Sequence, residues 1–379
     1  MRNILRPLSP AATPEERQPF AQIAAVDGGL VIAALLLAAV GLATVHSASS
    51  ELAVDYLPRQ ALWVGLGFVL LIGAVSIDYR VLLDLSLTLY LLGLVLLALV
   101  LVLGDVRGGA RSWFVFGPWQ FQPSEFAKLA TTLFVARYLS GIDQPVLALR
   151  QIATAVGLVA LPMLLIVVEP DMGGAAMFVP LLVGMLLIAG VKLRYLLTAA
   201  LLAASLGFGL WTFGMKEYQR DRVMTFLQPE RDPLGTGYHV RQSKIAVGSG
   251  ELFGKGYMQG TQSQLRFLPA RHTDFIFAVL AEEWGFAGIV TVLGLFALYI
   301  RGGARIAMRA RDRSGILIVV GLLSVFCFHV LYNTAMVVGF LPITGIPLPF
   351  LSYGGTFMLY NFTATGILLG VDLRRYVNR

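Results

Sequence analysis

Carboxylate and cationic side chains stand where long apolar segments of this sequence begin or end, and they are the residues best able to do chemistry. Asp274 follows Thr273 and leads directly into a long apolar segment. Its carboxylate could accept a proton from a bound hydroxyl group. The simpler interpretation is that Thr273 caps a helix and Asp274 lies in its first turn, where a negative charge suits the helix dipole. Both interpretations can hold together, because a cap also fixes a base in place.

A glutamate and a lysine three residues apart form the second candidate group. Glu125 and Lys128 lie near the start of the apolar segment 124–140, where they can pair on one face of a helix. A cation near a helix N-terminus opposes the helix dipole, so Lys128 needs a reason to be there. One explanation is a simple ion pair within the helix. The alternative is that Lys128 binds an anion, such as a phosphate or another carboxylate.

Two arginines and four further acids complete the set of candidates. Arg107 and Arg111 lie in a glycine-rich segment and could grip a diphosphate. Asp171, with Glu169 two residues before it, lies in a turn between two apolar segments, and both acids would face the same side as Asp274. Glu282 and Glu283 lie deeper in the segment that follows Asp274; one of them is expected to face the bundle interior with a partner, in a structural role.

These residues are positioned by a chain that is 57% hydrophobic and only 13% charged. Soluble domains contain about 45–50% apolar and about 25% charged residues, so the composition is that of a membrane protein. Because lipid satisfies no backbone hydrogen bonds, the apolar segments are predicted to be helices, in an all-α fold of about ten transmembrane spans. The predicted spans are residues 27–47, 60–77, 80–103, 124–140, 151–168, 173–190, 193–213, 274–300, 314–338 and 353–372.

The basic residues predict how these spans are oriented. Arginine and lysine accumulate on the cytoplasmic side of membrane proteins, and here they do so when both termini are placed inside. The candidate residues named above are then predicted to face away from the cytoplasm. The basic residues predicted inside are Arg2, Arg6, Arg17, Arg80, Arg137, Arg150, Lys192, Arg194, Arg301, Arg305, Arg309, Arg311, Arg313, Arg374, Arg375 and Arg379.

The segments outside the spans are few. Residues 1–26 are predicted to be a cytoplasmic tail, and residues 27–375 a single transmembrane domain with one long extracytoplasmic loop at about 214–273. Residues 339–350 contain three prolines and are predicted to be irregular, and therefore buried in protein or lining a cavity. The single cysteine, Cys327, can form no disulfide within the chain, and the four histidines show no metal-binding spacing.

Several motifs together resemble those of the SEDS family (shape, elongation, division and sporulation). The resemblance covers about residues 27–375, and its motifs are specific in combination rather than singly. Two positions depart from the family: Ala270 stands where an acid is common, and Glu169 where glutamine is common. The motifs are FQPSEFAK at 121–128, PDMG at 170–173, TQSQL at 261–265, and the segments 267–283 and 339–355.

The resemblance implies a GT-C-like SEDS fold and an enzyme that polymerises peptidoglycan from lipid II, in the bacterial inner membrane with its active site on the periplasmic side. The expected partner is a class B penicillin-binding protein, a transpeptidase that cross-links the product; no nucleic acid is expected. Residues 262–264 and 278–283 favour the branch that serves cell elongation and rod shape over the division branch. Carried over residue by residue, the essential carboxylate of the family falls on Asp274, its pair on Glu125 and Lys128, and a further acid on Asp171.

The expected reaction is an inverting transfer of the growing glycan from undecaprenyl diphosphate to lipid II. Asp274 would act as general base, while Lys128, Arg111 and Arg107 would stabilise the diphosphate. A divalent cation, Mg²⁺ or Mn²⁺, could share that task, although no ligand spacing identifies one. The alternatives are a lipid II flippase, which would need charged groups down to the cytoplasmic side, and a scaffold for cell-wall enzymes, which explains neither Lys128 nor the acids.

Overall fold

The structure is a computed structural model that describes residues 27–50, 55–107, 109–117, 119–209, 224, 228, 235–268 and 270–377. The predicted tail at 1–26 and most of the first part of the long loop lie outside these residues. The described helices are α2 (Gly28–Ser49), α3 (Leu57–Ser76), α4 (Tyr79–Asp84), α5 (Ser86–Leu103), α6 (Pro123–Ser140), α7 (Leu149–Val168), α8 (Met172–Ala176), α9 (Phe178–Ala189), α10 (Leu193–Gly209), α12 (Thr236–Ser249), α13 (Thr261–Gln264), α14 (Ile276–Arg309), α15 (Arg313–Val337) and α16 (Gly355–Val377).

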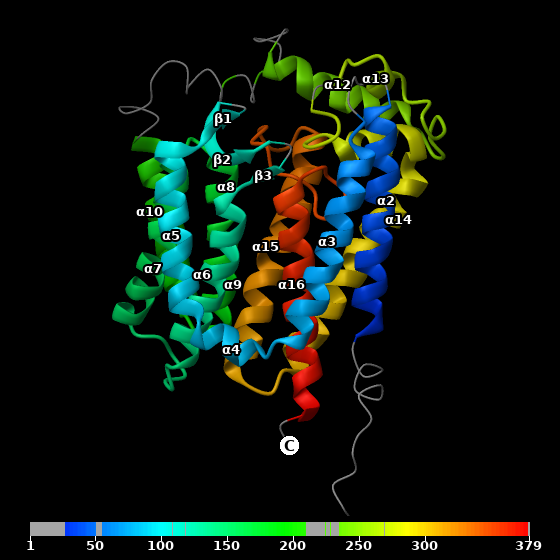
Figure 1. Ribbon diagram of the computed structural model, residues 1–379. Coiled ribbons are helices and arrows are strands. Elements are labelled where there is room, and N and C mark those ends of the chain that lie inside the picture. The colour runs from blue at the N-terminus through cyan, green and yellow to red at the C-terminus, as the bar shows by residue number, and fades with distance from the viewer. Residues whose placement is uncertain are drawn as a thin grey trace, which may run out of the picture.

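The long helices stand side by side in one bundle, with α12, α13 and three short strands at one end and α4 and the C-terminal end of α16 at the other (Figure 1). Each predicted apolar segment is mainly helical in the residues that the structure describes. Within the described residues, eight helical segments are long and apolar enough to cross a membrane. The charged residues of α6 and the length of α10, 17 residues, keep these two helices out of that set.

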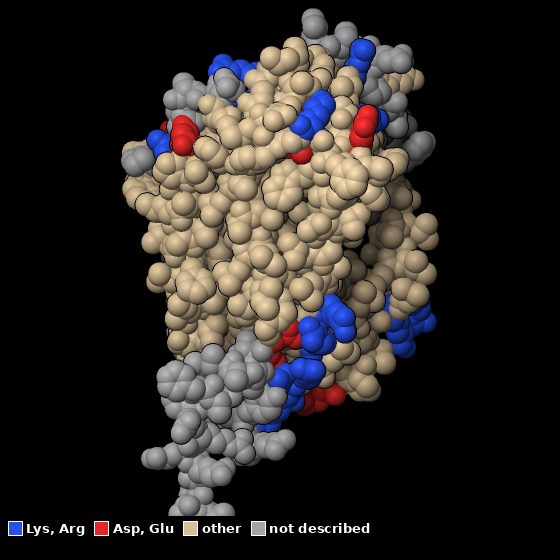
Figure 2. Space-filling view, turned by 90° about the vertical axis from the view of Figure 1, so that its right-hand side faces the viewer, with Lys and Arg blue, Asp and Glu red and all other residues tan. Residues whose placement is uncertain are grey.

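Large apolar side chains cover the outside of the bundle, where a soluble protein would be polar. Val69 on α3, Val95 on α5 and Leu164 on α7 are all more than half exposed. A band without charged residues separates the two charged ends of the molecule (Figure 2). Since such a surface is stable only in lipid, the chain is a multi-pass helical membrane protein.

Arginines that the sequence predicted to share one side of the membrane do gather at one end of the bundle, which we call the basic end. Arg305 pairs with Asp27 at 3.1 Å, so the last part of α14 lies beside the start of α2. The other contacts at this end are Arg80 with Asp312, Arg374 with Asp78, Arg313 with the carbonyl of Ala189, and Arg137 with the carbonyl of Asp84. These contacts tie the spans together where the chain leaves the apolar band.

A small antiparallel sheet at the opposite end was not predicted. Its strands are β1 (Asp105–Arg107), β2 (Ala110–Phe116) and β3 (Trp119–Phe121), in the order β1-β2-β3. The glycines at 108–109 and 117, which separate short runs with aromatic and β-branched residues, were a hairpin signal that could have identified it. Strand β3 ends at Phe121, two residues before the first residue of α6.

Helix α14 differs most from its prediction, which ended it at residue 300. The helix continues to Arg309, beyond the apolar band. Its last turns bear Arg301, Arg305 and Arg309, which are spaced four apart and therefore lie on one face of the helix. It is also kinked at Gly285, whose backbone is non-helical (φ 64°, ψ −161°). By contrast, the proline-rich segment after α15 is irregular, as predicted, and its Ile346, Leu348 and Phe350 side chains are buried in protein.

Candidate functional site

Glu125 and Lys128 form a buried ion pair in the first turns of α6. Lys128 Nζ lies 2.9 Å from Glu125 Oε1, and both residues are almost completely buried between α6, α15 and α16. Burying an ion costs several kcal/mol unless partners replace the water, so the surroundings of Lys128 must supply them. The ion pair within the helix is therefore present; whether Lys128 also meets an anion remains a prediction.

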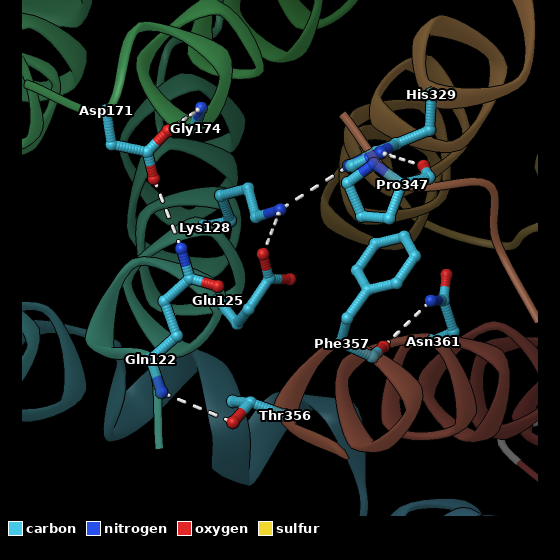
Figure 3. Close-up of polar contacts among 10 residues, drawn as sticks. All are labelled: Gln122, Glu125, Lys128, Asp171, Gly174, His329, Pro347, Thr356, Phe357 and Asn361. Carbon is cyan, nitrogen blue, oxygen red and sulfur yellow. Dashed lines mark hydrogen bonds and ion pairs between the residues drawn. The ribbon is translucent and has the colours of Figure 1, made fainter. Parts of the chain in front are cut away.

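His329 on α15 supplies a second partner for the lysine. Its Nε2 lies 3.4 Å from Lys128 Nζ, and its Nδ1 lies 3.0 Å from the carbonyl oxygen of Pro347 (Figure 3). An ammonium group can only donate, so Nε2 accepts, and Nδ1 carries the proton that is donated to Pro347. The ring of Tyr360 on α16 completes the environment, with its centroid 4.8 Å from Nζ.

Asp171 begins the short helix α8 and reaches across to the chain before α6. Its Oδ1 accepts from the backbone of Gly174 at 2.8 Å, and its Oδ2 accepts from Gln122 Nε2 at 3.1 Å (Figure 3). The backbone N–H of Gln122 in turn donates to Thr356 Oγ1 on α16. The turn predicted here is present, and Asp171 serves as the N-cap of α8 and as a tie to α6 and, through Gln122, to α16.

Glu169, two residues before Asp171, is a fully buried acid. Among the described residues, neither of its carboxylate oxygens has a hydrogen-bond partner. Burial, together with the nearby charge of Asp171, raises the pKa of Glu169 to about 8. With a pKa of about 8, Glu169 is mostly a neutral carboxylic acid at pH 7.

Asp274 lies two residues before the first residue of α14 rather than inside its first turn. The helix begins at Ile276, and Thr273 donates to the carbonyl of Ala270 rather than capping the helix. The predicted Thr273 cap is thus wrong, because the chain makes a tight turn over 271–275 before it becomes helical. Burial raises the pKa of the Asp274 carboxyl to about 6, although the neighbouring hydroxyl of Thr273 lowers it in part.

The turn that carries Asp274 is fixed by its neighbours rather than by its own helix. Asn333 Nδ2 on α15 donates to the carbonyl oxygen of Asp274 at 2.9 Å and to that of Ile346 at 2.8 Å. Ser352 Oγ donates to the carbonyl oxygen of Thr273 at 2.7 Å. These bonds hold the backbone on both sides of the carboxylate.

The same few residues connect Asp274 with Lys128. Asn333 and His329 are four residues apart on α15 and so lie on one face of that helix. Asn333 binds Asp274 and Ile346, whereas His329 binds Lys128 and Pro347. The structure therefore brings together three of the regions that the sequence singled out: the 271–275 turn, the start of α6 and the proline-rich segment.

The two arginines lie apart from these contacts. Arg111 on β2 is exposed and directs its guanidinium to the carbonyls of Leu101 and Val102, at the end of α5. Arg107 pairs through its backbone with Ala110 in the sheet, and its side chain lies outside the described part of the structure. Binding of a diphosphate by Arg107 and Arg111 therefore stays a prediction.

Glu282 and Glu283 both face the protein interior and both have partners. Glu282 accepts hydrogen bonds from Lys255 at 2.7 Å and from the backbone N–H groups of Gln262 and Ser263. Glu283 accepts from Ser47 on α2. An interior position with a partner was predicted for one of the two glutamates, and the structure shows it for both.

The described residues contain no group of three or more His, Cys, Asp or Glu side chains that could hold a metal ion. The divalent cation considered from the sequence, Mg²⁺ or Mn²⁺, stays a prediction.

His329, Asn333 and Gln122 are site residues that the sequence reasoning missed. The signal for the first two was available: a histidine and an asparagine four apart in an otherwise apolar helix are polar groups at membrane depth. Metal-binding spacing, the property by which the histidines were judged, does not reveal this pair. Gln122 could not be found in this way, because its partner Asp171 is 49 residues away in the sequence.

The fold and the polar cluster define a class of protein, a multi-pass helical membrane protein with a buried charged site toward the end opposite its basic end. The chain belongs to the FtsW, RodA and SpoVE family, described as "Cell cycle protein", whose family model matches residues 29–376; this is the SEDS family.

Curated relatives with known names match over nearly the whole chain. The chain is 39% identical over 350 residues to peptidoglycan glycosyltransferase MrdB of Escherichia coli, covering 92% of this chain and 94% of that protein. It is 33% identical to peptidoglycan glycosyltransferase RodA of Treponema pallidum, covering 91% of this chain and 97% of that protein.

Solved structures agree with the fold. A chain in a structure described as "Structural coordination of polymerization and crosslinking by a peptidoglycan synthase complex" superposes with a TM-score of 0.82 at 34% identity. The rod shape determining protein RodA of Thermus thermophilus superposes with a TM-score of 0.70 at 32% identity. Each alignment covers 93% of this chain and 98% of the other.

Proposed function

We propose that this chain polymerises lipid II into glycan strands for cell elongation, with Asp274 as the general base. Its enzyme class follows from its family and relatives: it is a peptidoglycan glycosyltransferase. The observation that carries the assignment of the base is the position of Asp274. It is the acid whose turn is fixed by Asn333 of α15 and by Ser352, and its pKa of about 6 suits proton transfer near neutral pH.

In the proposed reaction, the 4-hydroxyl of the lipid II GlcNAc attacks the anomeric carbon of the terminal MurNAc of the growing chain. A bond forms from that hydroxyl oxygen to the anomeric carbon, and the bond from this carbon to undecaprenyl diphosphate breaks with inversion. The hydroxyl proton passes to the carboxylate of Asp274, and the diphosphate leaves with the bonding electrons. Such base catalysis contributes about 10²–10⁴-fold.

The leaving diphosphate carries charge and requires cations rather than an acid. Lys128 is a buried cation that is joined to the network of Asp274 through His329, Asn333 and residues 346–347. Glu125 and Asp171 hold Lys128 and Gln122 in place, and Arg111 and Arg107 would bind the lipid diphosphate from the strands that precede α6. A preorganised cation of this kind acts where charge develops in the transition state.

The proposed location is the bacterial inner membrane, with the site on the periplasmic side. The basic end would face the cytoplasm, because the arginines that tie it together follow the positive-inside rule. The proposed partner is a class B penicillin-binding protein, because a structural relative belongs to a complex that couples polymerization and crosslinking.

The test is polymerisation of lipid II in detergent by the purified chain with its penicillin-binding partner, whose transpeptidase site is blocked. Wild type should give glycan polymer, and Asp274→Asn should give none while remaining folded. The matched control is Asp143→Asn, which removes an exposed acid from a loop at the basic end and should polymerise normally. Polymer from Asp274→Asn would refute the assignment of the base. No polymer from wild type with active lipid II would favour a flippase instead, since detergent contains no sealed bilayer.

A further inference from the structure

The loop between α12 and α13 contains an exposed apolar surface that the catalytic proposal does not use. Its residues 251–258 expose Leu252 by 64%, Phe253 by 83% and Tyr257 by 44%. Glu251, at the start of the loop, is exposed. The charge of Lys255 is directed inward, to Glu282 at 2.7 Å. The outward face of the loop is therefore apolar at its centre.

Two pairs of contacts fix the height of this loop along the bundle. Asp27 and Arg305 pair at the basic end, and Ser47 and Glu283 are hydrogen-bonded near the other end. These two levels are 20 residues apart on α2 and 22 residues apart on α14 (47 − 27 and 305 − 283). At 1.5 Å per residue they are about 30 Å apart, which is the thickness of the hydrocarbon core of a bilayer.

The loop is bound to α14 on the bilayer side of the upper level. Phe286 and Ala287 donate their backbone N–H groups to the carbonyls of Glu251 and Leu252, at 2.9 and 3.0 Å. Tyr257 donates its hydroxyl to the carbonyl of Ala43, four residues nearer the basic end than Ser47. These contacts lie about 4–6 Å inside the level of Ser47 and Glu283.

Backbone inside a bilayer must have its polar groups satisfied by protein, and much of this loop meets that requirement. The kink at Gly285 leaves backbone carbonyl and N–H groups of α14 without partners inside the helix, and the loop supplies these partners. The backbone N–H groups of Lys255 and Gly256 donate to the carbonyls of Glu282 and Glu283, at 3.0 Å each. Gly254 makes the close approach possible, since a Cβ on it would lie 2.1 Å from the Glu283 carbonyl oxygen. The loop and the kinked helix complete each other's hydrogen bonds.

We propose that residues 251–258 form an interfacial anchor that inserts Leu252 and Phe253 into the outer edge of the lipid bilayer. The occupant of this surface is lipid, because the surface is continuous with exposed Phe286 and Val290 on α14, which face the same apolar band. Tyrosine is enriched at the membrane interface, and Tyr257 belongs to this loop. Because the chain continues from the loop through α13 to the turn of Asp274, the anchor would hold that end of the site at a fixed height above the bilayer.

The test is site-directed spin labelling of the purified full chain alone in lipid nanodiscs. Cys327 is the only cysteine, so Cys327→Ser gives a clean background for a nitroxide at Phe253→Cys and, separately, at Leu252→Cys. Val95→Cys on the lipid-facing side of α5 and Gln144→Cys in an exposed loop are the lipid and water controls. Accessibility to oxygen and to a water-soluble nickel chelate is measured at each label.

The expected result is a loss of most nickel accessibility at positions 252 and 253, with oxygen accessibility kept, as at Val95. Nickel accessibility equal to that at Gln144 would place the loop in water and overturn the proposal. Loss of access to both reagents would mean that protein covers the surface, and would equally overturn it. None of these outcomes depends on catalysis, so the test is independent of the assignment of Asp274.

Discussion

The kink of α14 gives a sharp stability prediction, made by placing alanine at either of two glycines of the same helix. Gly285→Ala puts a side chain on a residue at φ 64° and ψ −161°, a conformation adopted essentially only by glycine, at a cost of about 1–3 kcal/mol. The new Cβ would also lie 2.3 Å from the backbone nitrogen of Gly254 and 2.7 Å from the carbonyl oxygen of Gly250. Backbone cannot move aside without weakening the bonds between the loop and α14, each worth about 0.5–1.5 kcal/mol.

Together, the backbone strain and the weakened hydrogen bonds should lower the free energy of unfolding of Gly285→Ala by about 3 kcal/mol or more. Gly294→Ala is the matched control, because nothing lies within 4 Å of its Cβ position and alanine favours a helix by up to about 1 kcal/mol. The assay is thermal unfolding of both purified variants in the same detergent, followed by tryptophan fluorescence. We expect Gly285→Ala to unfold well below wild type and Gly294→Ala at or slightly above it. Equal midpoints for the two variants would refute the role assigned to the kink.

Three further predictions concern the site. Because the pKa of Asp274 is about 6 and the base must be ionised, the initial polymerisation rate should fall about tenfold from pH 7 to pH 5; a flat profile over this range would contradict it. Glu169→Gln should keep nearly full activity at pH 7. The thermal stability of Glu169→Gln should also fall less than that of wild type between pH 5 and pH 9. In wild type, the stability that depends on a neutral Glu169 carboxyl is lost as the pH rises from the ordinary pKa of 4.5 to the raised pKa of about 8. An equal loss of stability in both proteins would argue against a buried neutral acid. His329→Ala removes one partner of Lys128 and the donor to Pro347, and should cost about 1–3 kcal/mol in thermal unfolding, whereas a midpoint like that of wild type would show that the histidine is dispensable.

Local patterns in the sequence were enough to predict the membrane helices and to predict which ends of these helices carry the arginines. Apolar runs of spanning length can satisfy their backbone only as helices in lipid, so their positions follow from composition alone. Asp274, Glu125, Lys128 and Asp171 were singled out in the same way, because charges at membrane depth are rare and usually functional. The motifs then indicated the family, which the comparisons confirm.

Tertiary structure decided which of these residues meet and how each one is held. The cap expected at Thr273 is absent, because contacts from Asn333 and Ser352, 59 and 79 residues away, fix the turn instead. His329 became a partner of Lys128 only because α6 and α15 pack together. The kink at Gly285 is stable only where the loop at 251–256 supplies its missing hydrogen bonds. Sequence periodicity reports which face of an element is apolar, whereas contacts between distant segments depend on how the whole chain packs.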